Sequence, residues 1–157
     1  MQRSLVGSEM CIRDSIVTDT NMALAGINKK MLAGFGGSVH CFMADETVAR
    51  IAKERGTTRA AVSMEMATKL NKPLIFAIGN APTALIQLYE MLKDQRFRPE
   101  FIIGVPVGFV NVEAAKELIL ETEVPHIVNR GRKGGSNVAA AICNAILYEL
   151  KKEQSGV

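Results

Sequence analysis

The amino-acid sequence predicts an α/β fold in three layers (αβα), with helices on both faces of a mainly parallel, five-stranded sheet. Short apolar runs alternate along the chain with longer segments of helical periodicity. The runs are nearly continuous in apolarity, as strands buried on both faces must be. Repeated strand–helix order of this kind produces a parallel sheet whose ligands bind beyond the carboxyl ends of the strands.

Each expected strand is one of the apolar runs, which cover residues 16–19, 39–43, 73–78, 101–105 and 125–128. The expected helices are marked by apolar residues three or four positions apart, which form one buried face. This spacing predicts helices over residues 58–70, 81–94 and 111–121, and a last helix in which Val138, Ile142, Ile146 and Leu150 recur every four residues.

The composition fits one globular domain. The 157 residues are 48% apolar and 22% charged, which is enough apolar material for a sizeable core. The net charge of +3 is spread along the chain and Trp is absent, so binding of nucleic acid is not expected. Cys11, Cys41 and Cys143 are odd in number and far apart, so neither a disulfide framework nor a zinc site is expected.

The sequence also predicts a cytoplasmic protein without membrane contact. No apolar stretch approaches the roughly 18 residues that span a bilayer, and residues 1–15 lack the apolar core of a signal peptide. Residues 1–15 have no clear period, and the first strand begins abruptly after them. We expect this stretch to be a non-native leader, with an ordinary N-terminal extension as the alternative, and residues 16–157 to form the single domain.

Two turns between a strand and a helix have the composition of anion-binding sites. Residues 128–136 combine two arginines, three glycines and a serine suited to cap the last helix. Backbone N–H groups of such a turn and of a helix N-terminus converge on negative charge, and Arg130 or Arg132 can add a bidentate contact to a carboxylate. Residues 78–85 repeat the pattern with Gly79, a capping Asn80 and a proline in the first helical turn.

Other polar residues near strand ends have two possible roles. Arg59 begins the helix expected over 58–70, where it could bind a carboxylate together with the helix N-terminus, or simply be solvated. Asn80 and Thr83 could each donate to a ligand or simply cap a helix, and capping is the expected role of Asn80. Asp19 and Asp45 each follow a strand and precede a helix, so N-capping is their expected role, with an acid–base role as the alternative.

Five motifs occur in an order that is shared with one protein family. They are Asp19-Thr-Asn-Met22 with Gly26-Ile27, Gly56-Thr-Thr-Arg59, Ile78-Gly-Asn-Ala-Pro-Thr-Ala-Leu85, Ile103-Gly-Val-Pro-Val-Gly-Phe-Val110 and Arg130-Gly-Arg-Lys-Gly-Gly-Ser136. Together they resemble the precorrin-8X methylmutase family, including its cobalt-precorrin-8 branch, over about residues 16–157. The resemblance implies an isomerase of cobalamin biosynthesis that moves a methyl group from C11 to C12 of the corrin ring. It also implies a homodimer with the active site at its interface, and no cofactor or protein-bound metal, because any cobalt belongs to the substrate.

A corrinoid is a broad apolar ring fringed by carboxylates, so its site needs apolar surface and a rim of hydrogen-bond donors. The candidate substrate-binding residues are Asp19, Met22, Thr58, Arg59, Asn80, Thr83, Arg130, Arg132, Gly134, Gly135 and Ser136. Because their motifs lie at strand ends or helix starts, we expect Arg59, Asn80, Thr83, Arg132 and Ser136 to line one cleft.

The sequence departs from the family pattern in its histidines. Relatives resemble one another in an Arg-x-x-His-x-x-Gly motif whose histidine is taken as the general acid, and this motif is absent here. His40 and His126 fall in expected strands and are interpreted as structural. We therefore expect impaired activity, and the sequence leaves open whether the substrate contains cobalt. The alternatives are a non-catalytic corrinoid-binding module and a nucleotide-dependent oxidoreductase, although no Gly-x-Gly-x-x-Gly follows the first strand.

Overall fold

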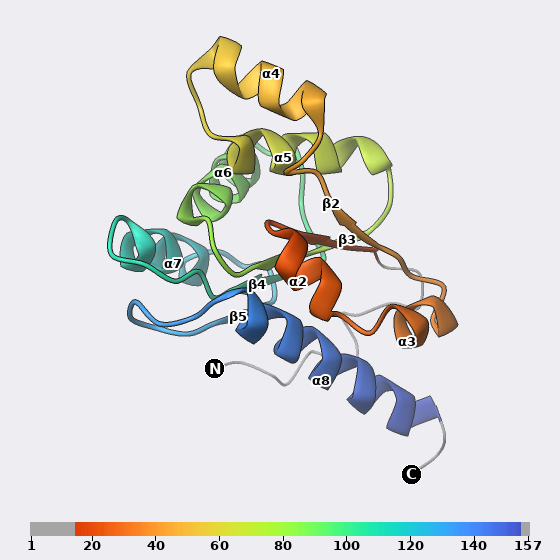
Figure 1. The fold of residues 1–157 in the computed structure, drawn as a ribbon. Helices are drawn as coiled ribbons and strands as arrows, with labels where there is room; N and C mark the ends of the chain where they lie inside the picture. Colours follow the sequence, from red (N-terminus) through yellow and green to blue (C-terminus); the bar gives the residue numbers. More distant parts are fainter. Residues whose placement is uncertain (1–14, 155–157) are drawn as a thin grey trace.

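Five parallel strands form the centre of the molecule in a computed structural model that describes residues 15–154. The strands are β1 (Ser15–Thr18), β2 (Val39–Cys41), β3 (Leu74–Ile78), β4 (Phe101–Gly104) and β5 (His126–Val128). They form one sheet in the order β2-β1-β3-β4-β5, and every neighbouring pair is parallel (Figure 1). The predicted three-layer fold is confirmed, with β3 and β4 adjacent in the interior of the sheet.

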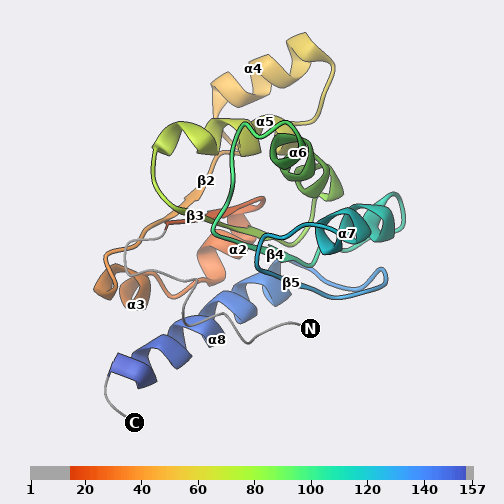
Figure 2. The same ribbon diagram turned by 180° about the vertical axis from the view of Figure 1, so that it is seen from behind.

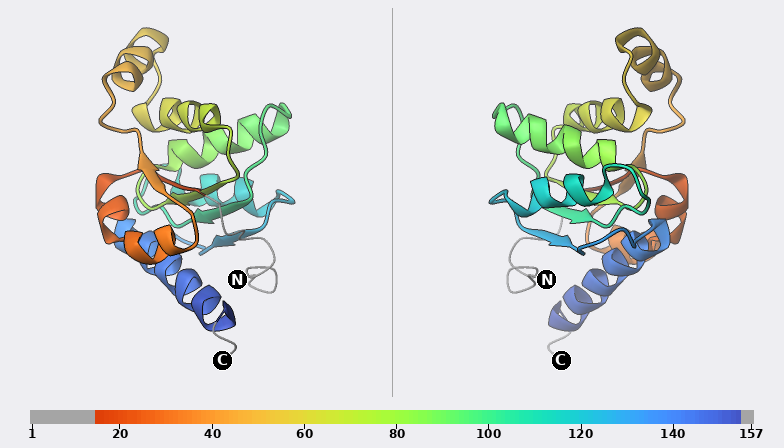
Figure 3. Two further views of the ribbon diagram at one scale, coloured as in Figure 1. Left: turned by 90° about the vertical axis from the view of Figure 1, so that its right-hand side faces the viewer. Right: turned by 90° about the vertical axis from the view of Figure 1, so that its left-hand side faces the viewer.

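Helices cover both faces of this sheet. One face carries α2 (Asn21–Gly26), α3 (Lys29–Gly34) and α8 (Ser136–Gln154), and the other carries α5 (Arg59–Ala67), α6 (Pro82–Lys93) and α7 (Val112–Leu120). Figure 3 shows the sheet between these two layers. A short 3₁₀ helix, η1 (Thr68–Leu70), extends α5, so the helix predicted over 58–70 is α5 followed by η1.

Alternation along the strands assigns the core residues to the two faces. Ile75 and Ala77 of β3 pack toward α8, whereas Phe76 and Ile78 pack toward α5 and α6. All of β3 is buried because both of its faces are covered, which explains its continuous apolar sequence.

One helix lies away from the sheet. α4 (Glu46–Arg55) packs on α5 through a small cluster of Val48, Ala52 and Val62, and it stands apart from the sheet in both Figure 1 and Figure 2. Asp45 caps α4, as expected, because its Oδ1 accepts from the N–H groups of Thr47 (2.8 Å) and Val48 (3.2 Å).

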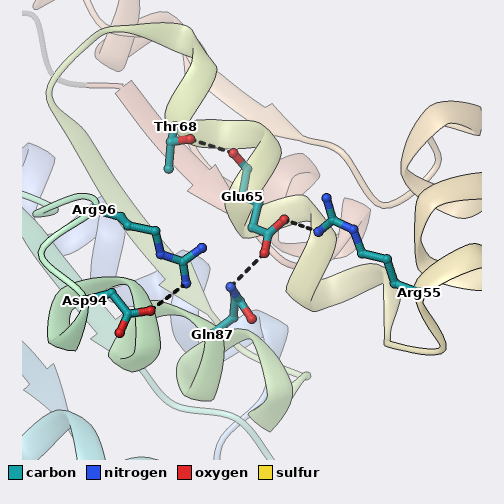
Figure 4. A network of polar contacts seen from close by, with 6 residues as sticks. All are labelled: Arg55, Glu65, Thr68, Gln87, Asp94 and Arg96. Atoms are coloured by element: carbon teal, nitrogen blue, oxygen red, sulfur yellow. Dashed lines mark hydrogen bonds and ion pairs between the residues drawn. The ribbon is translucent and has the colours of Figure 1, made fainter.

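A polar network around Glu65 joins the end of α4 to α5 and α6 (Figure 4). The Glu65 carboxylate lies 2.6 Å from Nη1 of Arg55 and accepts from Nε2 of Gln87 at 3.0 Å. The backbone carbonyl of Glu65 accepts from the Thr68 hydroxyl, and Arg96 and Asp94 form a separate ion pair at the end of α6. Since these groups are partly exposed, their ion pairs contribute little to the stability of the fold.

Within residues 15–154, no helix is both long and apolar enough to cross a membrane. The same part of the chain contains no group of three or more His, Cys, Asp or Glu residues arranged to hold a metal ion.

Candidate functional site

The loops that follow β1, β3, β4 and β5 are tied together at the carboxyl edge of the sheet. Asp19, directly after β1, is fully buried. Its Oδ1 accepts from the N–H of Gly79 at 2.9 Å, and its Oδ2 accepts from the N–H groups of Asn80 (2.8 Å) and Ala81 (2.6 Å). Asp19 therefore fixes the loop between β3 and α6.

The expected N-cap role of Asp19 is wrong. α2 begins at Asn21, so Thr20 occupies the cap position, and its Oγ1 accepts from the N–H of Ala23 at 3.1 Å. The Asp19 side chain is thereby free to reach the neighbouring strand's loop. Burial raises the pKa of this carboxyl, and the three backbone N–H groups oppose that rise.

The expected cap role of Asn80 is also wrong. Ala81 occupies the N-cap position of α6, and no side chain caps this helix. The Asp19 carboxylate accepts hydrogen bonds from the N–H groups of this loop, which a capping side chain at the start of α6 would otherwise do. The exposed Asn80 amide makes no hydrogen bond to the rest of residues 15–154, so it is available to a ligand.

The start of α8 packs closely against the β1 and β3 loops. The hydroxyls of Thr20 and Ser136 are 2.7 Å apart. A Cβ at Gly79 would lie 2.6 Å from both the Gly135 carbonyl oxygen and the Ser136 Cα, so only glycine permits this approach. Thr20, which was not among the candidate residues, therefore joins Ser136 to the β1 loop.

The start of α5 lies beside the start of α6. The Thr58 hydroxyl donates to Oγ1 of Thr83 at 3.0 Å and caps α5 by accepting from the N–H of Ala61. Arg59, the next residue, is exposed, and its guanidinium makes no hydrogen bond or ion pair within the described range. Arg59, Thr83 and Asn80 are thus brought to neighbouring helix starts.

The turn between β5 and α8 is fastened to the loop after β4. The N–H of Gly135 donates to the Val105 carbonyl at 2.9 Å, and the N–H of Gly108 donates to the Arg132 carbonyl at 3.2 Å. A Cβ at Gly134 would lie 2.0 Å from the Val105 oxygen, so a side chain cannot be accommodated there without moving the turn.

A buried lysine supports this turn from below. Lys116 of α7 is only 1% exposed, and its Nζ donates to the carbonyls of Gly131 (2.8 Å) and Lys133 (2.9 Å). Burial lowers the pKa of Lys116, and Glu113 opposes that change. Lys116 was missed in the sequence, although it lies on the same helix face as Val112 and Ile119, and a lysine on a buried face requires partners.

The two arginines of the turn differ in their surroundings. Nε of Arg132 is 3.1 Å from Oε1 of Glu113, and its guanidinium lies over the Phe109 ring at 5.6 Å. Phe109 itself is 83% exposed. Arg130 is exposed and unpaired among the described residues. Both guanidinium groups therefore remain at the surface, where an anion could reach them.

Met22 and the two histidines complete the set of sequence candidates. Met22 is 71% exposed on α2. His40 is hydrogen-bonded to Ser38 at 2.9 Å in β2, and burial and nearby Lys72 lower its pKa. Nδ1 of His126 donates to the Val124 carbonyl at 2.7 Å at the amino end of β5, which is the opposite edge of the sheet. Both histidines are thus hydrogen-bonded within the fold, and the structural role expected for them stays a prediction.

A shallow hollow of about 390 Å³ lies elsewhere, between α3 and the end of α8. It contains none of the candidate residues and is lined by Asn28, Lys30, Met31, Gly34, Phe35 and Lys151. The hydrogen bonds described above link the candidate loops to one another at the carboxyl edge. That the candidate residues of these loops line one cleft stays a prediction.

The fold and the linked turns define an α/β protein with donor-rich loops at the carboxyl edge of a parallel sheet. A model of the precorrin-8X methylmutase family matches residues 9–149. The chain belongs to this family.

Individual relatives agree with this assignment. Cobalt-precorrin-8 methylmutase of Salmonella typhimurium is 46% identical over 138 residues, which cover 87% of this chain and 64% of that protein. The protein of the same name from Leptospira interrogans is 41% identical, with 87% of this chain and 66% of that protein covered. The chain thus spans slightly less than two thirds of the length of these relatives. The solved structure of precorrin-8x methyl mutase from Thermus thermophilus has a TM-score of 0.84 and 34% identity, and covers 99% of this chain and 77% of that one.

Proposed function

We propose that this chain provides the corrinoid-binding part of a methylmutase that moves a methyl group from C11 to C12 of cobalt-precorrin-8 or precorrin-8X. The products would be cobyrinate and hydrogenobyrinate. The observation that carries the proposal is the match to the precorrin-8X methylmutase family over residues 9–149, a range that includes all the linked turns of the carboxyl edge, together with the 46% identity to a cobalt-precorrin-8 methylmutase. The cobalt, where present, belongs to the substrate.

The contacts of the turns support recognition of a carboxylate-fringed ring. Arg59, Arg130 and Arg132 supply cationic side chains, and Asn80 supplies an unengaged amide. The same loops carry the hydroxyls of Thr58, Thr83 and Ser136 and the unengaged N–H of Gly134, whereas the N–H of Gly135 is already bonded to the Val105 carbonyl. Asp19 fixes one of these loops, and Met22 offers apolar surface. Held in this way, the ring would keep C11 and C12 in the geometry that methyl migration requires.

The proposed reaction breaks the bond from C11 to the methyl group and forms one from C12, so no atom is gained or lost. A general acid would make the ring electron-poor and typically contributes about 10²–10⁴-fold. Neither histidine of this chain fits that role, because both are held by hydrogen bonds away from the linked turns. We therefore propose that residues 1–157 by themselves turn over slowly.

A spectroscopic assay tests this proposal. Purified residues 1–157 should bind hydrogenobyrinate and shift its absorption, yet convert precorrin-8X about 10²-fold or more slowly than a relative carrying the His motif. Placing a relative's His-containing segment before Ile16 should raise the rate. Rapid conversion by the unmodified chain would contradict the assignment of both histidines, and absence of any spectral change would contradict corrinoid binding.

A non-catalytic corrinoid-binding module is the second candidate, favoured by the structural hydrogen bonds of both histidines. It predicts the same spectral shift, but no recovery of turnover when the His-containing segment is supplied. The assay above therefore separates the two functions.

We further propose that the protein acts in the cytoplasm, and that it forms the homodimer that the family resemblance implies. The exposed side chains of Val107, Phe109 and Val110 beside the β5–α8 turn are apolar surface that an interface could cover. Light scattering at micromolar concentration should give twice the 17.0 kDa mass of the chain. A mass of one chain at all concentrations would contradict the dimer.

A further inference from the structure

A buried cationic side chain packs against the inner side of the β5–α8 turn, although the turn already carries three cationic side chains of its own. Arg130, Arg132 and Lys133 are all exposed on the turn, and Lys116 lies beneath it with 1% exposure. Glu113 is the acidic group beside them, where it contacts Arg132. Burying a further cation here costs free energy unless its hydrogen bonds are made, so its placement calls for a reason.

The contacts of Lys116 orient the peptide groups of the turn. Its ammonium holds the carbonyls of Gly131 and Lys133 inward, and the Lys133 carbonyl also accepts from Nδ2 of Asn129 at 2.8 Å. In a trans peptide the C=O and the following N–H point in opposite directions. The N–H groups of Arg132 and Gly134 are therefore turned away from Lys116.

These two N–H groups are also unengaged. The turn's other backbone bonds use the N–H groups of Gly108 and Gly135, and neither Arg132 N–H nor Gly134 N–H donates to any residue in the described part of the chain. Two outward N–H groups separated by one residue, beside two arginine side chains, can donate together to one anion.

We propose that Lys116 is a positioning residue for anion binding. By fixing two carbonyls inward, it presents the N–H groups of Arg132 and Gly134, with the guanidinium groups of Arg130 and Arg132, to one carboxylate of the ligand. The ligand would displace Glu113 from Arg132. This inference rests on the proposed corrinoid function for the identity of the carboxylate, but the orientation of the turn can be tested without it.

The first test measures the turn itself. Lys116→Met removes the charge and donors at similar length, Lys116→Arg keeps both, and Lys53→Met on exposed α4 is the matched control. Amide hydrogen exchange at Gly108 and Gly135 should accelerate about tenfold in Lys116→Met, with little change at Ile75 and Ile103 in the sheet. Lys116→Arg and Lys53→Met should exchange like the unmodified chain. Unchanged exchange at Gly108 and Gly135 in Lys116→Met would overturn the inference.

The second test measures binding of hydrogenobyrinate by its absorption change. The dissociation constant should rise about tenfold in Lys116→Met and be largely restored in Lys116→Arg, because the donors return. Equal affinity of Lys116→Met and the unmodified chain would overturn the positioning role. If the unmodified chain does not bind the corrinoid, the proposed function fails, and the exchange experiment alone decides the role of Lys116.

A third measurement does not depend on the folding of a variant. In the unmodified chain, the Lys116 ammonium protons should exchange slowly with water and show through-hydrogen-bond NMR couplings to the carbonyl carbons of Gly131 and Lys133. Ammonium protons that exchange as fast as those of exposed Lys53 would overturn the inference.

Discussion

At the scale of single residues, two buried charges organise the carboxyl edge in opposite ways. Asp19 accepts three backbone N–H groups, and Lys116 donates to two backbone carbonyls. A buried charge is unfavourable unless it is fully hydrogen-bonded, so each side chain selects the loop conformation that supplies its partners. Both loops therefore keep a defined shape without belonging to a helix or strand.

Asp19→Asn tests the first of these anchors. The amide keeps one oxygen but turns an NH₂ group toward backbone N–H groups, leaving at least one of them unpaired. We expect the free energy of unfolding in urea to fall by about 1–3 kcal/mol. Asp45→Asn is the matched control, since asparagine caps a helix about as well as aspartate and should change stability by less than about 0.5 kcal/mol. Equal effects of the two substitutions would contradict the anchoring role of Asp19.

Cys143 of α8 should be protected from alkylation in the folded protein. It is fully buried, and burial raises the pKa of its thiol to about 12. Because the folded state keeps this proton and the unfolded state releases it, the stability contribution is present below the ordinary pKa of 9.0 and is lost as the pH rises toward about 12. Mass mapping after iodoacetamide at pH 8.5 should find Cys41, which is half-buried, labelled well before Cys143. Equal labelling rates of the two cysteines would contradict the burial of Cys143 and show that α8 opens readily.

The same burial predicts the effect of a substitution. In Cys143→Ala, the decline of the free energy of unfolding above pH 9 should be shallower than in the unmodified chain, because the thiol that titrates is gone.

At the scale of elements, the strands and long helices could be predicted, whereas their caps could not. The run 73–78 is apolar throughout because β3 is covered on both faces, and Leu85 and Leu88 recur at helical spacing because α6 packs on the sheet. Asp19 and Asn80 were assigned to caps from neighbours in the sequence, but their partners come from an adjacent strand's loop. Such a contact depends on strand order, which local patterns do not specify.

Gly134→Ala tests the fit between the β5–α8 turn and the loop after β4. The added Cβ would meet the Val105 carbonyl oxygen at 2.0 Å, so the turn must move and lose the bond from Gly135 N–H to Val105. We expect a loss of about 2 kcal/mol or more in the free energy of unfolding. Gly34→Ala is the control, because no atom lies within 4 Å of its added Cβ and alanine is the better helix former. A stable Gly134→Ala variant with unchanged exchange at Gly135 would contradict the close packing.

At the scale of the whole molecule, the parallel sheet brings distant segments to one edge. Hydrogen bonds or close packing join three segments, which are residues 19–20, 79–83 and 134–136. A hydrogen bond also joins Thr58 to Thr83. The sequence could predict this gathering, since carboxyl ends of parallel strands share an edge. It did not identify Lys116, because helix 111–121 was interpreted from its apolar residues alone. The apolar face of α7 includes that lysine, and only the turn packed above it explains why.

The final prediction concerns the shared cleft, which requires Arg59 and Arg132 to contact one bound corrinoid from opposite parts of the chain. Each arginine would hold a different carboxylate, so Arg59→Ala and Arg132→Ala should each raise the dissociation constant for hydrogenobyrinate about tenfold. Because sites without shared partners contribute independently, the double variant should lose about a hundredfold. Arg50→Ala is the control, since Arg50 is exposed on α4 and faces only Glu54 at 4.0 Å among the described residues. If Arg59→Ala binds as tightly as Arg50→Ala while Arg132→Ala does not, the β5–α8 turn binds the corrinoid without α5, and the shared cleft is contradicted.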